Sequence, residues 1–464
     1  MTLAALVAGA LAVGIIIAFV AGKPAQNTAS TAPAAAGTDP ASAAPTTSST
    51  ETAAPLTKPV VGGPLTASDR GVTASTITVG VYEPDLGNLS ALGYDIGVHD
   101  VEGKFNAVKD KINAAGGING RKLALKFRKT DVIDQNKMRE NCLAFANDDK
   151  VFAEINGGGV YGAAVNCITQ DTRTPLLSGG AADTQYTNSD QYLITTSQSQ
   201  TRDSANLAWI LNERGLLKGR KIGVLDIDGY ADSARHGFIA TATTLGSKPA
   251  SEYTLTADAQ TAAAQVPLAV AQFKRDHVDT VILATNAVFG TQFVQTAASQ
   301  GATWTYHASD DQGAVSDPFL SKMPKSFNGV IGISSSTIGE ARVGIAEDAV
   351  SKACAANYQS RPYATKFGKD YRSSTDYTLT IFACSALDVF ARAATAAGTN
   401  LTRDGIVEAA QHLGTVTLPG VGGGAASYAP GKTDGGDFHR VVVADMSCKC
   451  WKPLSGSQFV RDHY

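Results

Sequence analysis

The sequence predicts an α/β protein with two doubly wound parallel-sheet lobes that are joined by a multi-crossing hinge. Short β-branched runs alternate with helix-length amphipathic segments from residue 76 onward, and this alternation occurs as two consecutive sets. The chain of 464 residues is also longer than one hydrophobic core normally supports. We expect residues 76–198 plus 329–415 to form the first lobe, and residues 199–328 plus 416–464 to form the second.

An apolar N-terminal helix is expected before the lobes. Residues 1–22 carry no charge, and their length suits a membrane-spanning helix of roughly 20 residues. A secretory signal peptide fits the same residues, with Val20-Ala21-Gly22 as a weak small-residue cleavage site. In both cases we expect the rest of the chain to be extracytoplasmic, at the cell surface, and either membrane-anchored or secreted.

Residues 23–75 are dominated by Ala, Thr, Ser, Pro and Gly, and no aromatic residue occurs between Phe19 and Tyr82. Such a segment buries too little apolar area to offset the entropy lost on ordering. We therefore expect a disordered linker that its prolines keep partly extended.

The first βα set begins with the β-branched run Ile77–Tyr82, which is followed by an amphipathic helix that Gly116-Gly117 ends. The strands expected in this set are Ile77–Tyr82, Leu123–Arg128, Val151–Ile155 and Pro175–Ser178. The helices expected between and after them are Val98–Ala115, Asp134–Asp148 and Ala163–Asp171.

The second set follows the same alternation after Thr196. Its expected strands are Lys221–Asp226, Ser251–Leu255, Asp279–Ala284, Trp304–Ala308 and Gly329–Ser334. Its expected helices are Arg202–Arg214, Ala231–Leu245, Thr261–Asp276 and Gly290–Gly301. Ligands of parallel sheets lie beyond the carboxyl ends of the strands, so two facing lobes place both sets of strand-end loops around one cleft.

Six cysteines accompany the predicted export, and oxidising compartments favour their pairing. We expect disulfides within three pairs, namely Cys142 with Cys167, Cys354 with Cys384, and Cys448 with Cys450. The first pair lies on two helices of one sheet face. A zinc site at Cys448, Cys450 and His439 is the weaker alternative, because a single C-x-C pair lacks half of the usual ligand set.

The charge is mixed along the chain, with 39 Lys and Arg against 42 Asp and Glu and a net charge of −3. No basic stripe indicates nucleic acid. We expect no nucleic-acid partner, no metal and no cofactor.

Gly157, Gly159 and Gly162 satisfy the pattern G-x-G-x-x-G between a predicted strand and a predicted helix. This is the outline of a dinucleotide-binding turn. That motif normally follows the first strand of its unit, whereas this loop follows the third. Main-chain N–H groups at a helix N-terminus also bind anions in general, so the position favours a small anionic ligand over NAD.

Segments in a fixed order along the chain resemble a known family. They include KDKINAAGGINGRKLALKF, TPLLSGGA, GRKIGVLDIDGYADS and VDTVILATNAVFGTQFVQTAASQG. They resemble the type I periplasmic binding proteins, in the branched-chain (Leu/Ile/Val) amino-acid-binding branch that serves ABC importers. The resemblance extends from about Thr76 to the C-terminus, and INAAGGINGRKL is its most specific part. The linker and the paired cysteines are similar to those of actinobacterial members.

The resemblance implies ligand contacts from both lobes. In the first lobe they are the loop residues Gly158, Gly159, Val160 and Tyr161, and Gly180, Ala181, Ala182 and Asp183, which would hold a ligand carboxylate. In the second lobe they are Tyr230, Phe289, and Asp310 or Asp311, where the acidic side chain would receive a ligand ammonium. The structural alternatives are a helix-capping Tyr230, a core Phe289 and a solvated acidic turn.

This sequence departs from the family at two positions that we align to Gly159 and Ala182, where amino-acid binders offer hydroxyls. Carboxylate recognition would then depend on main-chain N–H groups, with Tyr161 or Thr184 assisting. The departure leaves small metabolites other than standard α-amino acids open.

The resemblance implies a monomeric, non-catalytic solute-binding protein. It would capture a small polar metabolite, an amino acid or a related amide or acid, and deliver it to the permease subunits of an ABC importer. The N-terminal segment would associate it with the membrane. A ligand-sensing ectodomain of similar fold and an NAD-dependent enzyme are the alternatives.

Overall fold

The computed structural model describes residues 64–91, 96–132, 134–256, 259–310, 314–368 and 371–463. The apolar segment 1–22 and linker residues 23–63 lie outside these ranges. Residues 64–75 are described, and they are folded rather than part of a disordered linker. The Ser68 hydroxyl donates to the Leu401 carbonyl at 2.6 Å, Arg403 pairs with Asp69 at 3.0 Å, and Val72 is buried. The fold begins earlier than predicted because these contacts offset the cost of ordering a low-complexity segment.

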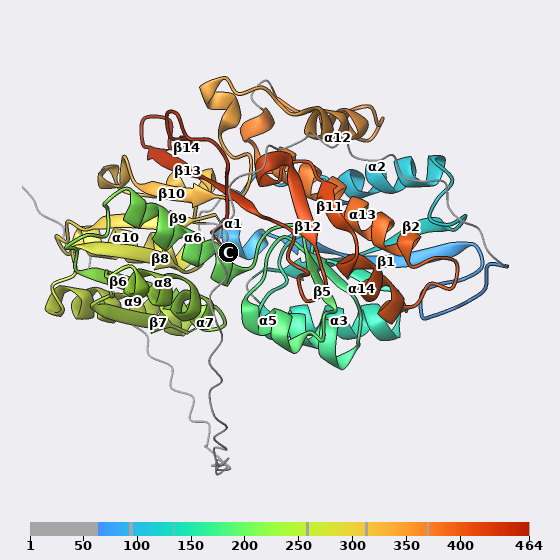
Figure 1. Ribbon diagram of the computed structural model, residues 1–464, viewed down its shortest axis with the longest axis horizontal. Helices are drawn as coiled ribbons and strands as arrows, with labels where there is room; N and C mark the ends of the chain where they lie inside the picture. The colour runs from blue at the N-terminus through green and yellow to red at the C-terminus, as the bar shows by residue number, and fades with distance from the viewer. Residues whose placement is uncertain are drawn as a thin grey trace, which may run out of the picture. The chain divides into compact units, whose positions relative to one another are not determined.

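The first lobe contains a five-stranded parallel sheet with the order β2-β1-β3-β4-β5 (Figure 1). The strands are β1 (Thr76–Asp85), β2 (Lys122–Asp131), β3 (Ala153–Ile155), β4 (Leu176–Ser178) and β5 (Leu193–Thr195). The helices of this part are α1 (Gly87–Ala91), α2 (Val101–Ala114), α3 (Gln135–Asn147), α4 (Ala163–Asn166), the π-helical turn η1 (Cys167–Asp171) and α5 (Asp183–Asn188).

The second lobe contains an eight-stranded sheet with the order β14-β13-β10-β9-β8-β6-β7, and β15 pairs with β13. The parallel strands are β6 (Ile222–Ile227), β7 (Ser251–Leu255), β8 (Thr280–Ala284), β9 (Thr305–Ser309) and β10 (Ile331–Ser334). The antiparallel strands are β13 (Phe438–Asp445), β14 (Cys450–Pro453) and β15 (Val460–Arg461). The helices are α6 (Gln200–Glu213), α7 (Ala231–Ala234), η2 (Arg235–Ile239), α8 (Ala240–Thr244), α9 (Ala259–Arg275), α10 (Ala287–Ser299), α11 (Asp317–Leu320) and η3 (Lys325–Phe327).

The chain then returns to the first lobe. The returning elements are η4 (Glu340–Val343), α12 (Ala349–Gln359), η5 (Tyr371–Ser373), α13 (Thr375–Ala396), α14 (Arg403–Gln411), β11 (Gly414–Thr417), η6 (Gly422–Gly424) and β12 (Ala425–Tyr428). Among the described helices, α13 is long and apolar enough to cross a membrane, by length and composition alone. Its buried residues pack with those of β1, β3 and α14 in the core of the first lobe, as expected of a central core helix.

Strand pairing moves two of the predicted lobe boundaries. β10 pairs with β9 and β13, so residues 331–334 belong to the second sheet although the predicted boundary lies at residue 329. β12 pairs with β11, and its Tyr428 is buried in the first-lobe core, so the segment after residue 416 stays with the first lobe until about β13. Each boundary depends on which sheet accepts a strand, which local sequence does not specify.

Several chain crossings join the lobes, as predicted. The Thr195 amide donates to the Thr433 carbonyl at 2.9 Å, and the Gly422 amide donates to the Ser335 carbonyl at 2.6 Å. Arg202, at the start of α6, pairs with Asp434 and with other carboxylates of the C-terminal segment. The hinge is therefore built from main-chain hydrogen bonds reinforced by one arginine.

All three predicted disulfides are present. Cys142 of α3 is bonded to Cys167 of η1 with a Cα–Cα distance of 6.4 Å, and Cys354 of α12 is bonded to Cys384 of α13 with 6.2 Å. Cys448 and Cys450 are bonded to each other. His439, the nitrogen ligand of the zinc alternative, instead places Nδ1 at 2.7 Å from Asp462 Oδ1.

Candidate functional site

A cavity of about 360 Å³, here called the polar cavity, is lined by residues of both lobes and of the segments that connect them. From the first lobe it is lined by Gly179, Gly180, Ser373, Ser374, Thr375 and Thr378. From the second lobe and the crossing after β10 it is lined by Asp310, Ser316, Asp317, Ser335, Ser336, Thr337 and Arg342. This volume falls within the usual range for small-molecule sites.

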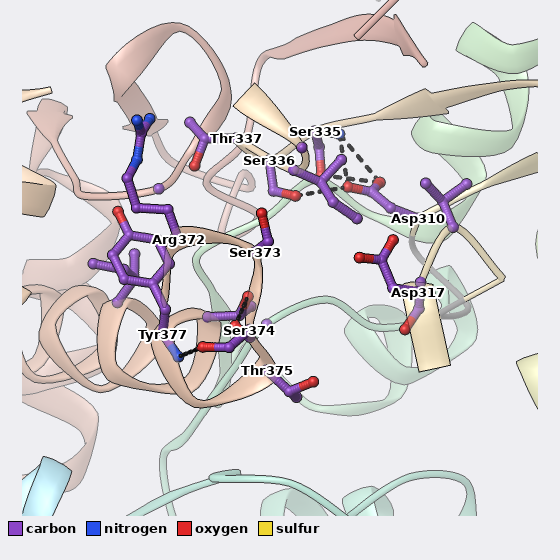
Figure 2. Close-up of a pocket in the computed structure, with 18 of the residues that line it drawn as sticks. Asp310, Asp317, Ser335, Ser336, Thr337, Arg372, Ser373, Ser374, Thr375 and Tyr377 are labelled. Carbon is purple, nitrogen blue, oxygen red and sulfur yellow. Dashed lines mark hydrogen bonds between the residues drawn. The ribbon is translucent and has the colours of Figure 1, made fainter. Parts of the chain in front are cut away.

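Two short hydroxyl-rich segments face this cavity, and Figure 2 shows their side chains. Ser335, Ser336 and Thr337 follow the last residue of β10, where the chain crosses between the lobes. The other segment, residues 373–375, leads into α13, and the Ser374 hydroxyl caps that helix by accepting from the Tyr377 amide at 3.1 Å. The polar wall therefore arises from a strand end and a helix start.

Asp310 lies at the end of β9 and is held by its own lobe. The Ser335 amide donates to both of its carboxylate oxygens, at 3.1 and 3.0 Å, and the Ser336 hydroxyl donates at 3.1 Å. The Ser334 hydroxyl also donates to this carboxylate. Burial raises the pKa of Asp310, although these hydrogen bonds favour the charged form and oppose that shift. The serines thus occupy much of the acceptor capacity of Asp310.

A second buried acid, Asp203 of α6, lies near Asp310. Burial, and secondarily the neighbouring Asp310 carboxylate, raises the pKa of Asp203 well above its usual range. The Gln198 carboxamide, which also lines the polar cavity, donates to Asp203 Oδ1 at 2.9 Å. This acidic pair forms part of the interior next to the cavity.

Two arginines line the polar cavity, and they differ in their partners. Arg342 donates to the Trp451 carbonyl at 2.6 Å and to the Asp317 carboxylate, which also accepts from the Trp451 amide at 2.8 Å. Arg372 donates to the Ile345 carbonyl at 2.9 Å, but its ion pair with Glu340 is longer, at 3.7 Å. Because a guanidinium carries five N–H donors, Arg372 retains donors for an anionic group.

A second cavity, of about 460 Å³ and here called the apolar cavity, adjoins the first. The two share Gly179, Thr375 and Thr378 in their walls. The apolar cavity is lined mainly by aliphatic, aromatic and glycine residues, among them Pro84, Leu86, Ile96, Val98, Val132, Gly157, Gly158, Gly159, Phe319, Leu379 and Phe382. It lies where the loops after β1 and β3 diverge, which is the point at which the strand order reverses and where ligands of such sheets bind.

The glycine loop borders the apolar cavity, but some of its main-chain N–H groups already donate hydrogen bonds within the loop. The Asn156 carboxamide oxygen accepts from the Gly158 and Val160 amides, each at 3.2 Å. Two of the main-chain donors expected to hold a ligand carboxylate are therefore already bonded. Gly159 has φ of +94°, and a Cβ there would lie 2.8 Å from Val132 Cγ1, which explains why no hydroxyl-bearing residue occupies this position.

The other predicted first-lobe residues divide into one cavity residue and several packing residues. Gly180 lines the polar cavity. Val160 and Ala181 are buried in the cluster around the Cys142–Cys167 disulfide, and Tyr161 packs against that cluster. Ala182 is buried at the N-cap of α5. Asp183 is the first residue of α5.

The residues predicted in the second lobe also lie in different environments. Asp310 lines the polar cavity together with Gly180. Tyr230 precedes α7 and lines a small cavity of about 10 Å³. Phe289 is 5% exposed and lies in the core of this lobe, which agrees with its structural alternative. Asp311 lies outside the described residues.

Sequence reasoning missed the hydroxyl segments, the two arginines, and the apolar residues Phe319, Leu379 and Phe382. One signal was present, because the runs Ser334-Ser335-Ser336-Thr337 and Ser373-Ser374-Thr375 lie next to a strand end and a helix start. The other residues carry no local signal, since they come together only when the chain returns to the first lobe.

The comparisons with known proteins agree with this architecture. A family model described as "Periplasmic binding protein" matches residues 76–444. No curated protein sequence matches the chain closely enough to count as a relative.

Several solved structures share the fold at low sequence identity. A fatty acid ABC transporter substrate-binding protein from Thermomonospora curvata is 18% identical, with a TM-score of 0.59, and the match covers 86% of this chain and 94% of that one. The branched-chain amino acid transporter substrate-binding protein LivJ from Streptococcus pneumoniae, in complex with isoleucine, is 16% identical with a TM-score of 0.58, covering 83% and 100%. A solute-binding protein from R. palustris, in complex with 4-hydroxybenzoate, is 16% identical with a TM-score of 0.62, covering 84% and 98%.

Proposed function

Because this chain belongs to the periplasmic binding protein family, we propose that it is a solute-binding protein that captures a small polar metabolite between its lobes and delivers it to an ABC importer. Membership of the family implies an extracytoplasmic location. The candidate ligands are amino acids and related amides or acids. The named ligands of the structural neighbours, isoleucine and 4-hydroxybenzoate, support a search across small carboxylates and amino acids.

The polar cavity is the observation that carries this proposal. Its walls come from the first lobe, the second lobe and the crossing segment after β10. A solute that contacts all three binds most tightly when the lobes are close together, so it shifts the equilibrium toward a closed form. A transporter can distinguish such a closed form from the empty protein.

The remaining parts of the proposal concern partners. The closed protein would dock on the permease subunits of an importer, as a monomer. The apolar segment 1–22 would keep it at the membrane, either as an anchor or before cleavage as a signal peptide.

The experiment is a calorimetric screen of the full-length protein against amino acids, their amides and small carboxylates. We expect at least one solute to bind with one-to-one stoichiometry and to reduce the radius of gyration in solution scattering. Thr378→Val, which removes one hydroxyl from the shared wall of the two cavities, should weaken that binding. Thr378 is exposed, so the substitution should leave the unfolding temperature nearly unchanged. A screen without any binding solute would contradict the proposal.

A further inference from the structure

The polar and apolar cavities form one composite site. They share Gly179, Thr375 and Thr378, so a ligand that passes these residues occupies both cavities at once. The short helix α11 contributes to each, because Asp317 lines the polar cavity and Phe319 lines the apolar one. The ligand therefore needs an apolar part and a polar part.

The apolar cavity selects the body of the ligand. Phe319 of the second lobe lines it together with Leu379 and Phe382 of α13 in the first lobe. Transfer of an aliphatic chain or an aromatic ring from water to such walls is favourable, whereas a hydroxyl-rich solute such as a sugar would lose hydrogen bonds to water there.

The acids that line the polar cavity do not suit a ligand ammonium. Asp310 already accepts hydrogen bonds from Ser334, Ser335 and Ser336. Asp317 accepts from the Arg342 guanidinium and from the Trp451 amide. An ammonium placed there would have to displace these internal donors, which makes its desolvation costly.

The polar cavity offers a site for an anion instead. Arg372 lines it, and the ion pair between Arg372 and Glu340 is 3.7 Å long, which leaves guanidinium donors for a carboxylate. The N-terminus of α13, a helix of 22 residues, lies at the same wall, and its dipole favours negative charge. Figure 2 shows the Arg372 side chain beside Thr337, which lines the same cavity.

We infer that the solute is an amphipathic monocarboxylate without an ammonium group, with its aliphatic or aromatic body in the apolar cavity and its carboxylate at Arg372. This inference rests on the proposed function, because it names the ligand class of the same site. It sets this chain apart from a binder of zwitterionic amino acids.

Matched pairs of ligands test the inference by calorimetry on the full-length protein. Leucine and 4-methylpentanoate share a carbon skeleton and differ by the ammonium group, as do phenylalanine and 3-phenylpropanoate. We expect at least one carboxylate to bind tenfold or more tightly than its amino acid. If leucine or phenylalanine binds as tightly as its partner, or if only solutes of other classes bind, the inference is overturned while the proposed function stands. If no solute of the wider screen binds, the proposed function itself fails.

Variants locate the two ends of the ligand. Arg372→Gln should weaken 4-methylpentanoate binding tenfold or more but leave binding of the neutral 4-methylpentanamide within threefold. That difference separates lost charge recognition from misfolding. Phe319→Ser should weaken both ligands. Equal losses of acid and amide in Arg372→Gln would show that Arg372 does not receive the carboxylate and would overturn the assignment.

Discussion

The two sheets place their parallel strands in the same relative order but differ where that order reverses. In the first lobe the loops after β1 and β3 border the apolar cavity of about 460 Å³. In the second lobe the corresponding region, after β6 and at the end of β8, contains a cavity of only about 10 Å³ next to Tyr230. Phe289, which follows β8, is buried in the core.

This difference shows that the strand order determines where a pocket can form, whereas the residues in that region determine whether space remains there. The strand order brings two loops to the carboxyl edge of each sheet. Glycines at 157–159 let the first-lobe loop lie close to Tyr82, Pro84 and Val132, whereas Phe289 of the second lobe is buried in the core. The first lobe thus supplies a pocket, and the second supplies a packed wall that carries Asp310 and α11.

The largest effect should come from removing the buried ring of Phe289 near the start of α10. Phe289→Ala should lower the free energy of unfolding by about 3–5 kcal/mol, because it leaves a cavity in a close-packed core. Leu86→Ala, at the edge of the apolar cavity, should cost less than about 1 kcal/mol, since Leu86 is only partly buried. Urea unfolding followed by circular dichroism measures both, and similar losses would show that the two regions are packed alike.

The next effect concerns the disulfide beside the open loop. Cys142→Ala with Cys167→Ala opens a loop of 25 residues and should cost about 3 kcal/mol. The matched control, Cys448→Ala with Cys450→Ala, removes a bridge between residues two positions apart and should have a much smaller effect. Scanning calorimetry compares the two double variants. A larger loss of stability in the control variant would contradict the prediction that the disulfide closing the longer loop contributes more stability.

A smaller effect is expected from adding one methyl group to a glycine in each of the two regions. Gly159→Ala should cost about 2 kcal/mol, because its φ of +94° is unfavourable for alanine and the new Cβ would lie 2.8 Å from Val132 Cγ1. Gly290→Ala in α10 should be neutral or stabilising by up to about 1 kcal/mol, since its Cβ would lie 3.6 Å from Thr285 Cγ2. Thermal unfolding of both variants tests this, and tolerance of alanine at 159 would show that the loop backbone adjusts.

A further effect is a pH dependence that differs between the lobes. Burial raises the pKa of Glu154 in β3 from 4.5 to about 8, and burial raises the pKa of Asp226 in β6 from 3.8 to about 7. The folded state keeps each proton to higher pH than the unfolded state, so the free energy of unfolding falls as pH rises through each interval. The slope is at most about 1.4 kcal/mol per pH unit for each group.

Two variants separate these contributions. Glu154→Gln should remove the part of the slope that extends to about pH 8, and Asp226→Asn should flatten the profile only below about pH 7. Urea unfolding between pH 5 and pH 8.5 provides the profiles. Identical profiles for both variants and the unsubstituted protein would show that neither acid is protonated in the folded state at neutral pH.

The strands of both parallel sheets were largely predictable, because short β-branched runs between helix-length segments are a local signal. The run Ser251–Leu255 coincides with β7, and Asp279–Ala284 contains β8. The first strand extends further than predicted, to Asp85, because Pro84 and Asp85 pair with Thr130 and Asp131 of β2. The antiparallel pairing of β13 and β14 was not predicted, since it depends on the chain returning to β10.

By itself the sequence determined the alternation of strands and helices, the three cysteine pairs and the glycine loop after the third strand. Each of these depends on residues close together in the chain or on a pairing that export favours. Only the tertiary structure decided where the ligand space lies and which groups are open to it. Arg372 and Asp310 line the same cavity although 62 positions separate them in the sequence. Ser335, which follows β10, donates its amide hydrogen to the Asp310 carboxylate. Such choices depend on distances between distant segments, which no local pattern encodes.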